Sequence, residues 1–437
     1  ISTRWKKISI FWFRRDLRLD DNSGLYNSLK ENNSVLPIFI YDKNILDKLN
    51  LNDHRIEYIN HAVLKMNEVL SKKNKSISCF YGKPEQVFLN LINQFDIKKV
   101  YTNRDYTPYS NKRDLIIKEL LENNGIQFFD YKDHVLFEKN EIVKDDGSPY
   151  KVYTPFSKKW INKMYEQGIP KYMSENLIEN LINEKNTFNT ESIGFTKSKI
   201  NFLKSNISKE IVNNYELKRN FPSSNGTSKI GVELRFGTIS TRKLITKAND
   251  SNNITFLKEL IWREFFQQIL HHFPKTINTS FKSKYERIEW LNDENNFKKW
   301  CNGQTGYPLV DAGMRELNKT GFMHNRVRMV VGSFLCKHLL IDWRWGEAYF
   351  REKLFDYETA SNIGNWQWVA GCGVDAAPYF RIFNPHEQLK KFDKQFNYVK
   401  QWVPEFETNQ YASPIVDHKE ARERCLITYK KALNNWV

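Results

Sequence analysis

Hydrophobic positions in the first 130 residues follow two alternating patterns. Short runs rich in β-branched and aromatic residues are separated by segments in which apolar residues recur at the helical period. The runs cover residues 7–13, 34–42, 76–82, 98–103 and 126–131, and the helical segments cover 56–70, 84–95 and 112–125. Strands that alternate with helices predict an α/β domain, with a parallel sheet and helices on both of its faces.

The pattern changes after about residue 140. Residues 140–225 are rich in Lys, Asn, Ser and Glu and show no strong apolar face, which predicts a partly helical connection that includes 175–186. Strand signals nearly vanish beyond it, and 256–273, 307–321 and 324–355 carry helical patterns. We therefore predict an α/β domain over residues 5–131, an interdomain connection over 132–205 and an all-α domain over 206–437.

Composition narrows the classes of protein to consider. The chain has 67 Lys and Arg against 51 Asp and Glu, a formal net charge of +16, and a basic surface attracts polyanions such as nucleic acid. Because Lys and Asn are abundant throughout, charge alone leaves this open. The five cysteines have no zinc-type spacing, which predicts a reduced protein without a structural metal. No apolar run reaches the ~20 residues of a membrane span, so we expect a cytoplasmic protein, or a nuclear one in a eukaryote.

Tryptophan is concentrated in the predicted helical domain, where nine of the twelve follow residue 250. If residues 360–368 form a helix, Asn362 and Trp366 lie on one face and offer a carboxamide and an indole to the same neighbour. A flat, redox-active ring would suit this pair. The alternative is a core helix that contains a buried Trp and a hydrogen-bonded Asn.

Two further helical segments carry paired charges. Glu259 and Arg263 lie one turn apart, either as a solvated ion pair or as polar groups beside the aromatic wall of Trp262. Arg326 and Arg328 diverge around their helix, so that one can meet a phosphate while the other pairs with an acid.

Small residues at 225–231 precede a helical stretch and could hold a phosphate, although an ordinary helix cap explains them better. The chain has neither a G-x-G-x-x-G nor a P-loop motif, and it shows no nucleophile elbow or zinc-protease motif. The sequence therefore gives no support to a conventional dinucleotide site, a nucleotide triphosphatase or a hydrolase.

Motifs along nearly the whole chain resemble those of the DNA photolyase and cryptochrome family, most of all class I cyclobutane pyrimidine dimer photolyases. They include FWFRRDLRLDDN at 11–22, YKVYTPF at 150–156, ELIWREF at 259–265, TGYPLVDAGMREL at 305–317 and TGFMHNRVRM at 320–329, with NWQW and DAAPYFRIFNP after residue 364. The resemblance implies an enzyme, a carbon–carbon lyase. In it, light-excited reduced FAD in the helical domain repairs a dimer flipped out of UV-damaged DNA.

The resemblance also implies a monomer, and it leaves one alternative function, a cryptochrome-type blue-light receptor without repair activity. Asn362 favours repair, because plant-type receptors tend to carry Asp there. A (6-4) photolyase is disfavoured, since TGFMHNRVRM contains no His-His pair.

Roles for individual residues follow from the resemblance alone. Glu259 and Asn362 would act in the reaction, and Trp366, Trp343 and Trp290 would relay electrons to the flavin, while Arg328 and Asp356 would pair beside its ring. The residues that would bind FAD are Tyr215, Thr227, Ser228, Lys229, Ile230, Gly231, Phe256, Arg328, Asp356, Glu358 and Asn362. The residues that would bind the dimer or the DNA are Arg219, Glu259, Trp262, Arg263, Asn325, Arg326, Met329 and Trp368.

Several positions depart from the usual residues of the family. Gly231 stands where Ser is frequent, Glu358 where Asp is usual, and Phe256 and Phe322 where Trp is frequent. Thr107 occupies a position at which folate-binding members carry Glu. A second, antenna chromophore is expected, and folate, deazaflavin and flavin are its alternatives.

Overall fold

The computed structural model describes residues 6–251 and 254–434, and the chain divides into two compact units. The first unit comprises Ile1–Glu138, Ile161–Phe202 and Gly231–Asp250, and the second comprises Lys139–Trp160, Leu203–Ile230 and Ser251–Val437. The predicted connection over 132–205 is thus shared between the units, and residues 231–250 belong to the first. Residues 1–5, 252–253 and 435–437 lie outside the described part of the chain. They include the predicted domain limits at residues 5 and 437.

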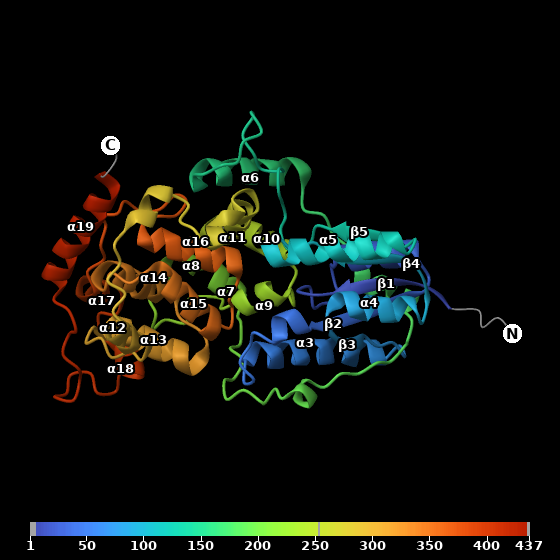
Figure 1. Ribbon diagram of the computed structural model, residues 1–437, viewed down its shortest axis with the longest axis horizontal. Helices are drawn as coiled ribbons and strands as arrows, with labels where there is room; N and C mark the ends of the chain where they lie inside the picture. The colour runs from blue at the N-terminus through green and yellow to red at the C-terminus, as the bar shows by residue number, and fades with distance from the viewer. Residues whose placement is uncertain (1–5, 252–253, 435–437) are drawn as a thin grey trace. The chain divides into compact units, whose positions relative to one another are not determined.

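Five parallel strands form the sheet of the first unit, in the order β3-β2-β1-β4-β5 (Figure 1). They are β1 (Lys7–Phe13), β2 (Val35–Asp42), β3 (Ser78–Gly82), β4 (Asp96–Asn103) and β5 (Gln127–Tyr131). All five coincide with the predicted strands within about two residues at either end, and the predicted α/β class is confirmed.

Alternating side chains of β1 enter cores on opposite faces of the sheet. Ile10 and Trp12 belong to one apolar core together with Phe88 of α4 (Pro84–Ile92). On the other face, Phe11 packs beneath α1 (Ser23–Glu31), where a Cβ at Gly24 would lie only 2.9 Å from the phenyl ring. Because both faces are covered, the strand reads as a nearly continuous apolar run.

The remaining elements of the first unit flank the sheet or extend from it. They are α2 (Lys43–Leu46), α3 (His54–Ser71), α5 (Pro108–Asn123), the 3₁₀ helices η1 (Ser174–Asn180) and η2 (Thr190–Ile193), α9 (Gly231–Phe236) and α10 (Thr241–Asn249). The helical pattern at 175–186 yields only η1, after which Leu181 is extended (φ −70°, ψ 149°).

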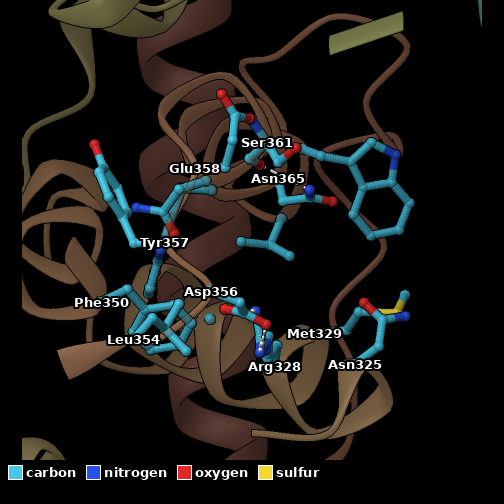
Figure 2. A pocket seen from close by; sticks show the side chains of 15 residues that line it. Asn325, Arg328, Met329, Phe350, Leu354, Asp356, Tyr357, Glu358, Ser361 and Asn365 are labelled. Atoms are coloured by element: carbon cyan, nitrogen blue, oxygen red, sulfur yellow. Dashed lines mark hydrogen bonds and ion pairs between the residues drawn. The ribbon is translucent and has the colours of Figure 1, made fainter. Parts of the chain in front are cut away.

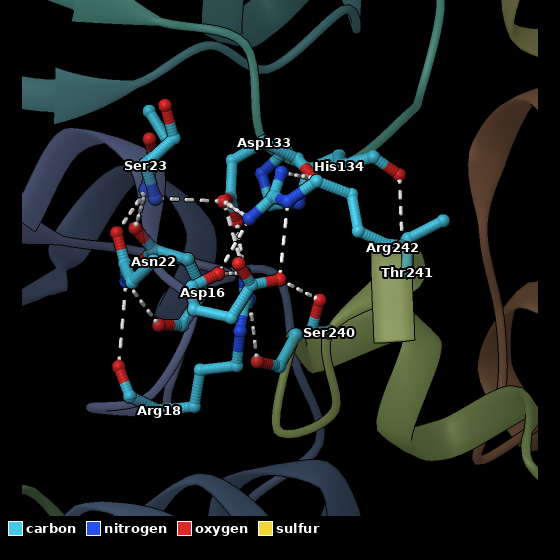
Figure 3. Close-up of polar contacts among 12 residues, drawn as sticks. Asp16, Arg18, Asn22, Ser23, Asp133, His134, Ser240, Thr241 and Arg242 are labelled. Atoms are coloured by element: carbon cyan, nitrogen blue, oxygen red, sulfur yellow. Dashed lines mark hydrogen bonds and ion pairs between the residues drawn. The ribbon is translucent and has the colours of Figure 1, made fainter. Parts of the chain in front are cut away.

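A buried ion-pair network holds the start of α10 within the first unit (Figure 3). The Asp133 carboxylate accepts hydrogen bonds from Arg18 Nη2 (2.7 Å) and Arg242 Nη2 (2.8 Å), and Asp21 accepts one from Arg242 Nε (3.1 Å). Burial would raise the pKa of Asp133, but the guanidinium groups of Arg18 and Arg242 hold it well below its usual range. Each buried charge therefore depends on its partners.

The second unit is built from helices. They are α7 (Lys209–Asn213), α8 (Tyr215–Lys218), α11 (Ile254–His272), α12 (Glu294–Cys301), α13 (Pro308–Thr320), α14 (Asn325–Ser333), α15 (Trp343–Lys353), α16 (Thr359–Ala370), α17 (Pro385–Phe392), α18 (Asn397–Trp402) and α19 (His418–Asn434), with short helices η3 (Pro274–Ile277) and η4 (Ser283–Arg287). α6 (Tyr153–Gln167) is divided between the units at residue 160. None of the helices in the described part of the chain has the length and apolar character of a membrane span.

The helical pattern over 324–355 is broken in the structure. α14 ends at Ser333, a π-helical turn (η5, Phe334–His338) follows, and α15 begins at Trp343. Between them Leu340 has a φ of +48°, a left-handed conformation in which its Cβ crowds the backbone and which no α-helix contains. Apolar residues recur at the helical period on both sides of Leu340, so the sequence pattern could not reveal the end of α14 and the start of α15.

Candidate active site

Fifteen residues from α14, α15, α16 and the loop before α16 line a hollow in the second unit (Figure 2). The space between these residues is about 620 Å³, a figure that includes open solvent. Eight of the predicted site residues come together here. They are Asn325, Arg328, Met329, Asp356, Glu358, Asn362, Trp366 and Trp368.

Arg328 and Asp356 face each other in this hollow as a two-pronged ion pair (Figure 2). The guanidinium Nη1 and Nη2 donate to the two carboxylate oxygens at 3.2 and 2.8 Å, and Nε donates to the backbone oxygen of Met323 at 2.6 Å. The three bonds fix the plane of the guanidinium. The resemblance implied this pair, and its place beside a flavin stays a prediction.

Glu347 of α15 orients the carboxamide of Asn362. The Asn362 Nδ2 group donates to the backbone oxygen and to the Oε1 atom of Glu347, both at 3.2 Å, and both residues are buried. Since the amide hydrogens are directed at α15, the carbonyl Oδ1 is left as the acceptor that Asn362 can offer a ligand. Sequence reasoning missed Glu347, because it lies 15 residues away on another helix and no spacing singles it out.

Glu358 acts as the N-cap of α16. Its side chain accepts a hydrogen bond from the backbone nitrogen of Ser361 at 2.9 Å, which satisfies one of the free N–H groups at the start of the helix. Glu358 thereby supports the first turn of the helix that carries Asn362.

Trp366 forms the inner wall of the hollow. Its ring contacts Phe350 and Trp300, with centroid separations of 4.9 and 6.1 Å, and its Nε1 has no acceptor among the described residues although it is buried. A Cβ at Gly346 would lie 2.1 Å from the indole, so only glycine lets α15 approach it. The spacing argument found Trp366 but not Trp300, which is fully buried and bonds to the Val331 carbonyl.

The other two tryptophans of the implied relay lie in or against the same apolar core. Trp343 is fully buried beneath the guanidinium of Arg344, 4.7 Å from its ring centroid. Trp290 is half-buried and meets the ring of Tyr429 at 6.1 Å. The relay order Trp366, Trp343, Trp290 stays a prediction.

A second group of predicted residues gathers around α11. The Glu259 carboxylate pairs with Arg219, which follows α8, while Arg263 lies half-buried one turn further along α11. Burial raises the pKa of Glu259, and the Arg219 guanidinium opposes this rise. Tyr215 and Phe256 meet edge to face at 5.2 Å.

Arg326 lies on the α14 side of this group. Its Nη2 donates to Asn220 Oδ1 at 2.8 Å, and its guanidinium lies 4.4 Å from the centroid of the Phe392 ring. Arg326 and Arg328 therefore point to different neighbours, as their spacing on the helix predicted.

The segment proposed to hold a phosphate is divided between the two units. Thr227, Ser228, Lys229 and Ile230 belong to the second unit, and Gly231 begins α9 in the first. Ser228 and Ile230 are buried, and Lys229 has a left-handed backbone with a φ of +53°. None of these residues lines the hollow, so their contact with a cofactor stays a prediction. Within the described residues, no group of three or more His, Cys, Asp or Glu is placed to hold a metal ion.

Two family models match the chain. One, described as the FAD binding domain of DNA photolyase, matches residues 256–410, and one described as DNA photolyase matches residues 9–174. The chain is 34% identical to a deoxyribodipyrimidine photo-lyase of Agrobacterium fabrum, with 96% of this chain and 97% of that protein covered.

Solved structures give the same result. A bacterial class III photolyase from Agrobacterium tumefaciens matches with a TM-score of 0.88 and 33% identity, covering 99% of this chain and 98% of that one. An archaeal photolyase from Sulfolobus tokodaii, solved with two FAD molecules, matches with a TM-score of 0.82 and 33% identity, covering 97% of this chain and 100% of that one.

Proposed function

This chain belongs to the DNA photolyase family, and we propose that it is a deoxyribodipyrimidine photo-lyase that repairs cyclobutane pyrimidine dimers in DNA with the energy of light. The observation that carries the proposal is the hollow, which gathers eight predicted site residues within the part of the chain matched by the FAD-binding model. The resemblance to class I stays a prediction, since the Agrobacterium tumefaciens structure is that of a class III photolyase.

The hollow fits the ring of FAD. Apolar side chains of Met329, Phe350 and Trp366 suit a flat aromatic ligand, and the polar side chains that line the same hollow can fix its orientation. Asn362 offers a carbonyl oxygen, and Trp366 holds a buried Nε1 donor without an acceptor among the described residues. When bound, reduced FAD supplies the electron that light drives into the dimer.

The residues around this ring prepare its environment before any reaction. Asp356 fixes the orientation of the Arg328 guanidinium and compensates its charge, so the pair presents an oriented set of donors and acceptors at the hollow. Asn362 accepts a hydrogen bond without carrying a charge, and Glu347 prevents its amide from turning. We include further contacts to the cofactor in this proposal. The residues that would make them are Tyr215, Thr227, Ser228, Lys229, Ile230, Gly231, Phe256 and Glu358.

UV-damaged DNA is the proposed partner, and we propose that the protein acts on it as a monomer. The positive charge of the chain favours phosphate binding, and Arg219, Arg263 and Arg326 are the proposed contacts to the backbone. A dimer flipped out of the helix would meet Glu259 and the aromatic ring of Trp262. Asn325, Met329 and Trp368, all lining the hollow, would complete its pocket.

We also propose a second chromophore that collects light. The Sulfolobus tokodaii photolyase with two FAD molecules, described as implying a novel light-harvesting cofactor, supports a flavin among the three alternatives. Thr107, where folate-binding members carry Glu, caps α5 through a hydrogen bond from Ser110 N. Extraction of the purified protein and mass spectrometry of the released chromophores would identify the second pigment.

Repair is tested directly with UV-irradiated oligothymidine. Photoreduced protein should restore the thymine absorbance under blue light and leave it unchanged in the dark, because the electron transfer requires excitation. The control is undamaged oligothymidine, whose absorbance should stay constant in both conditions. A protein that binds FAD but restores no absorbance under light would instead support the cryptochrome-type receptor.

Trp366→Phe should reduce photoreduction of oxidised FAD by an external donor at least about tenfold, since phenylalanine is much harder to oxidise than indole. Chemically pre-reduced variant should still repair dimers, because the proposed relay feeds the flavin and not the DNA. Trp402→Phe, at a position that does not line the hollow, is the matched control and should change neither rate. Loss of both activities in Trp366→Phe would show that this residue serves packing alone.

A further inference from the structure

The ring of Tyr153 lies flat against the indole of Trp262. The ring centroids are 3.7 Å apart and the planes differ by 4°, a full face-to-face contact. Phe265 meets the indole edge-on at 5.6 Å, and Phe266 lies 5.5 Å away at 29°. Tyr153 therefore covers one face of Trp262, and the rings of Phe265 and Phe266 further restrict how the indole can meet a ligand.

Tyr153 is itself fixed at two points. Its hydroxyl donates to the backbone oxygen of Lys258 at 2.8 Å, one turn before Trp262 on α11. Its backbone nitrogen donates to Asp375 Oδ2 at 3.0 Å, and the residue is buried. Because the Tyr153 ring is tied to the same helix that carries Trp262, the two planes cannot turn independently.

We propose that Tyr153 is a positioning residue that determines how well the protein distinguishes a pyrimidine dimer from undamaged bases. This inference rests on the proposed function, in which Trp262 forms part of the dimer pocket. An indole with both faces free stacks on any planar base, since every base has a π-face. An indole that is held in one plane, with one face covered, cannot insert between stacked bases. It contributes binding energy only to a ligand whose shape matches its surface.

The dimer is such a ligand. Its two pyrimidines are joined through saturated carbons, so they are no longer planar and present a bent, apolar surface. A fixed wall stabilises a surface of matching shape without the entropy loss of ordering a free side chain. Tyr153 thus acts through Trp262, and it should contribute to binding of damaged DNA and little to binding of undamaged DNA.

A double-mutant cycle on the flavin-loaded, full-length protein tests the proposal. Affinities for one oligonucleotide with and without a dimer are measured in the dark for the wild type, Tyr153→Met, Trp262→Leu and the double variant. Methionine fills much of the volume without providing a plane. We expect Tyr153→Met to weaken dimer binding about three- to tenfold, in line with the strength of aromatic pairs, and to leave undamaged DNA within about twofold.

The double variant should bind the dimer as Trp262→Leu does, because Tyr153 has no effect without the indole. Tyr153→Phe keeps the stack and loses only the hydroxyl bond to Lys258, so it should retain more of the wild-type preference than Tyr153→Met. Tyr150→Leu is the matched control in the same segment, since Tyr150 contacts Phe156 and should not alter the preference. The salt dependence of binding should be unchanged in every variant, because no phosphate contact is removed.

Three outcomes would overturn the proposal. They are losses that add in the double variant, an equal loss for damaged and undamaged DNA in Tyr153→Met, and a loss of preference in Tyr153→Phe as large as that in Tyr153→Met. A wild type that shows no preference for the dimer would contradict the proposed function instead, so the two failures are distinguishable. If Tyr153→Met does not fold, as judged by circular dichroism, Tyr153→Leu takes its place in the cycle.

Discussion

Asp133→Ala should lower the free energy of unfolding of the first unit by about 3–5 kcal/mol, the range seen when one partner of a buried ion pair is removed. Asp133 is fully buried and accepts hydrogen bonds from both Arg18 and Arg242, which are themselves buried. Alanine would remove the carboxylate that the two buried guanidinium groups share, and of the two only Arg242 would keep its ion pair with Asp21. Urea denaturation followed by circular dichroism measures the change.

The pH dependence of this loss gives a second check. The folded-state pKa of Asp133 lies below its unfolded value of about 4, so its contribution is complete at neutral pH. This contribution is lost as the pH falls through the lowered folded-state pKa, so the difference in unfolding free energy between wild type and Asp133→Ala should narrow in acid.

Asp130→Ala is the control. Its carboxylate is 43% exposed and pairs with Arg104 at 3.2 Å, so its removal should change stability by less than about 1 kcal/mol. A similarly small change for Asp133→Ala would mean that the network does not hold the fold.

Asn362→Asp should lower the one-electron reduction potential of bound flavin by about 60 mV, which is one decade in the equilibrium constant, and slow repair at least about tenfold. The physical reason is charge. An ionised carboxyl in the hollow disfavours a negatively charged reduced ring, whereas the native carboxamide accepts a hydrogen bond and stays neutral.

The neighbouring carboxylate of Glu347 should strengthen the effect of Asn362→Asp on the reduction potential. The new carboxyl would lie at the position from which Asn362 Nδ2 donates to Glu347 at 3.2 Å, so a second acid would replace the hydrogen-bond donor and add its charge to that of Glu347. Glu347→Gln in the same chain removes this conflict and should restore part of the potential and of the repair rate. Asn365→Asp places the same charge on α16 at an exposed position that lines the hollow, and it is the matched control.

Spectroelectrochemical titration and repair kinetics test this expectation. They are measured on four proteins, which are the wild type, Asn362→Asp, Asn362→Asp with Glu347→Gln, and Asn365→Asp. Potentials and rates that are identical in wild type and Asn362→Asp would remove Asn362 from the active site. A shift in Asn365→Asp as large as that in Asn362→Asp would show that any added charge in the hollow has the effect. In that case the orientation imposed by Glu347 would have no special importance.

Local patterns along the chain determined a large part of this protein. Apolar periodicity predicted the five strands and the helices α3, α4, α5, α11 and α13, because side-chain direction repeats every two residues in a strand and every 3.6 in a helix. The same rule placed Asn362 beside Trp366 and separated Arg326 from Arg328. Long motifs gave the family, and with it Arg328 and Asp356 as partners.

Only the tertiary structure decided which side chains from different segments meet. The pairing of Glu259 with Arg219 joins residues 40 positions apart, and the stack of Tyr153 on Trp262 joins two helices. Glu347 of α15 reaches Asn362 of α16, and the left-handed Leu340 divides a stretch in which apolar residues recur at the helical period on both sides. Such contacts depend on the path of the backbone between elements, which local periodicity does not encode, because it records only which face of each element is buried.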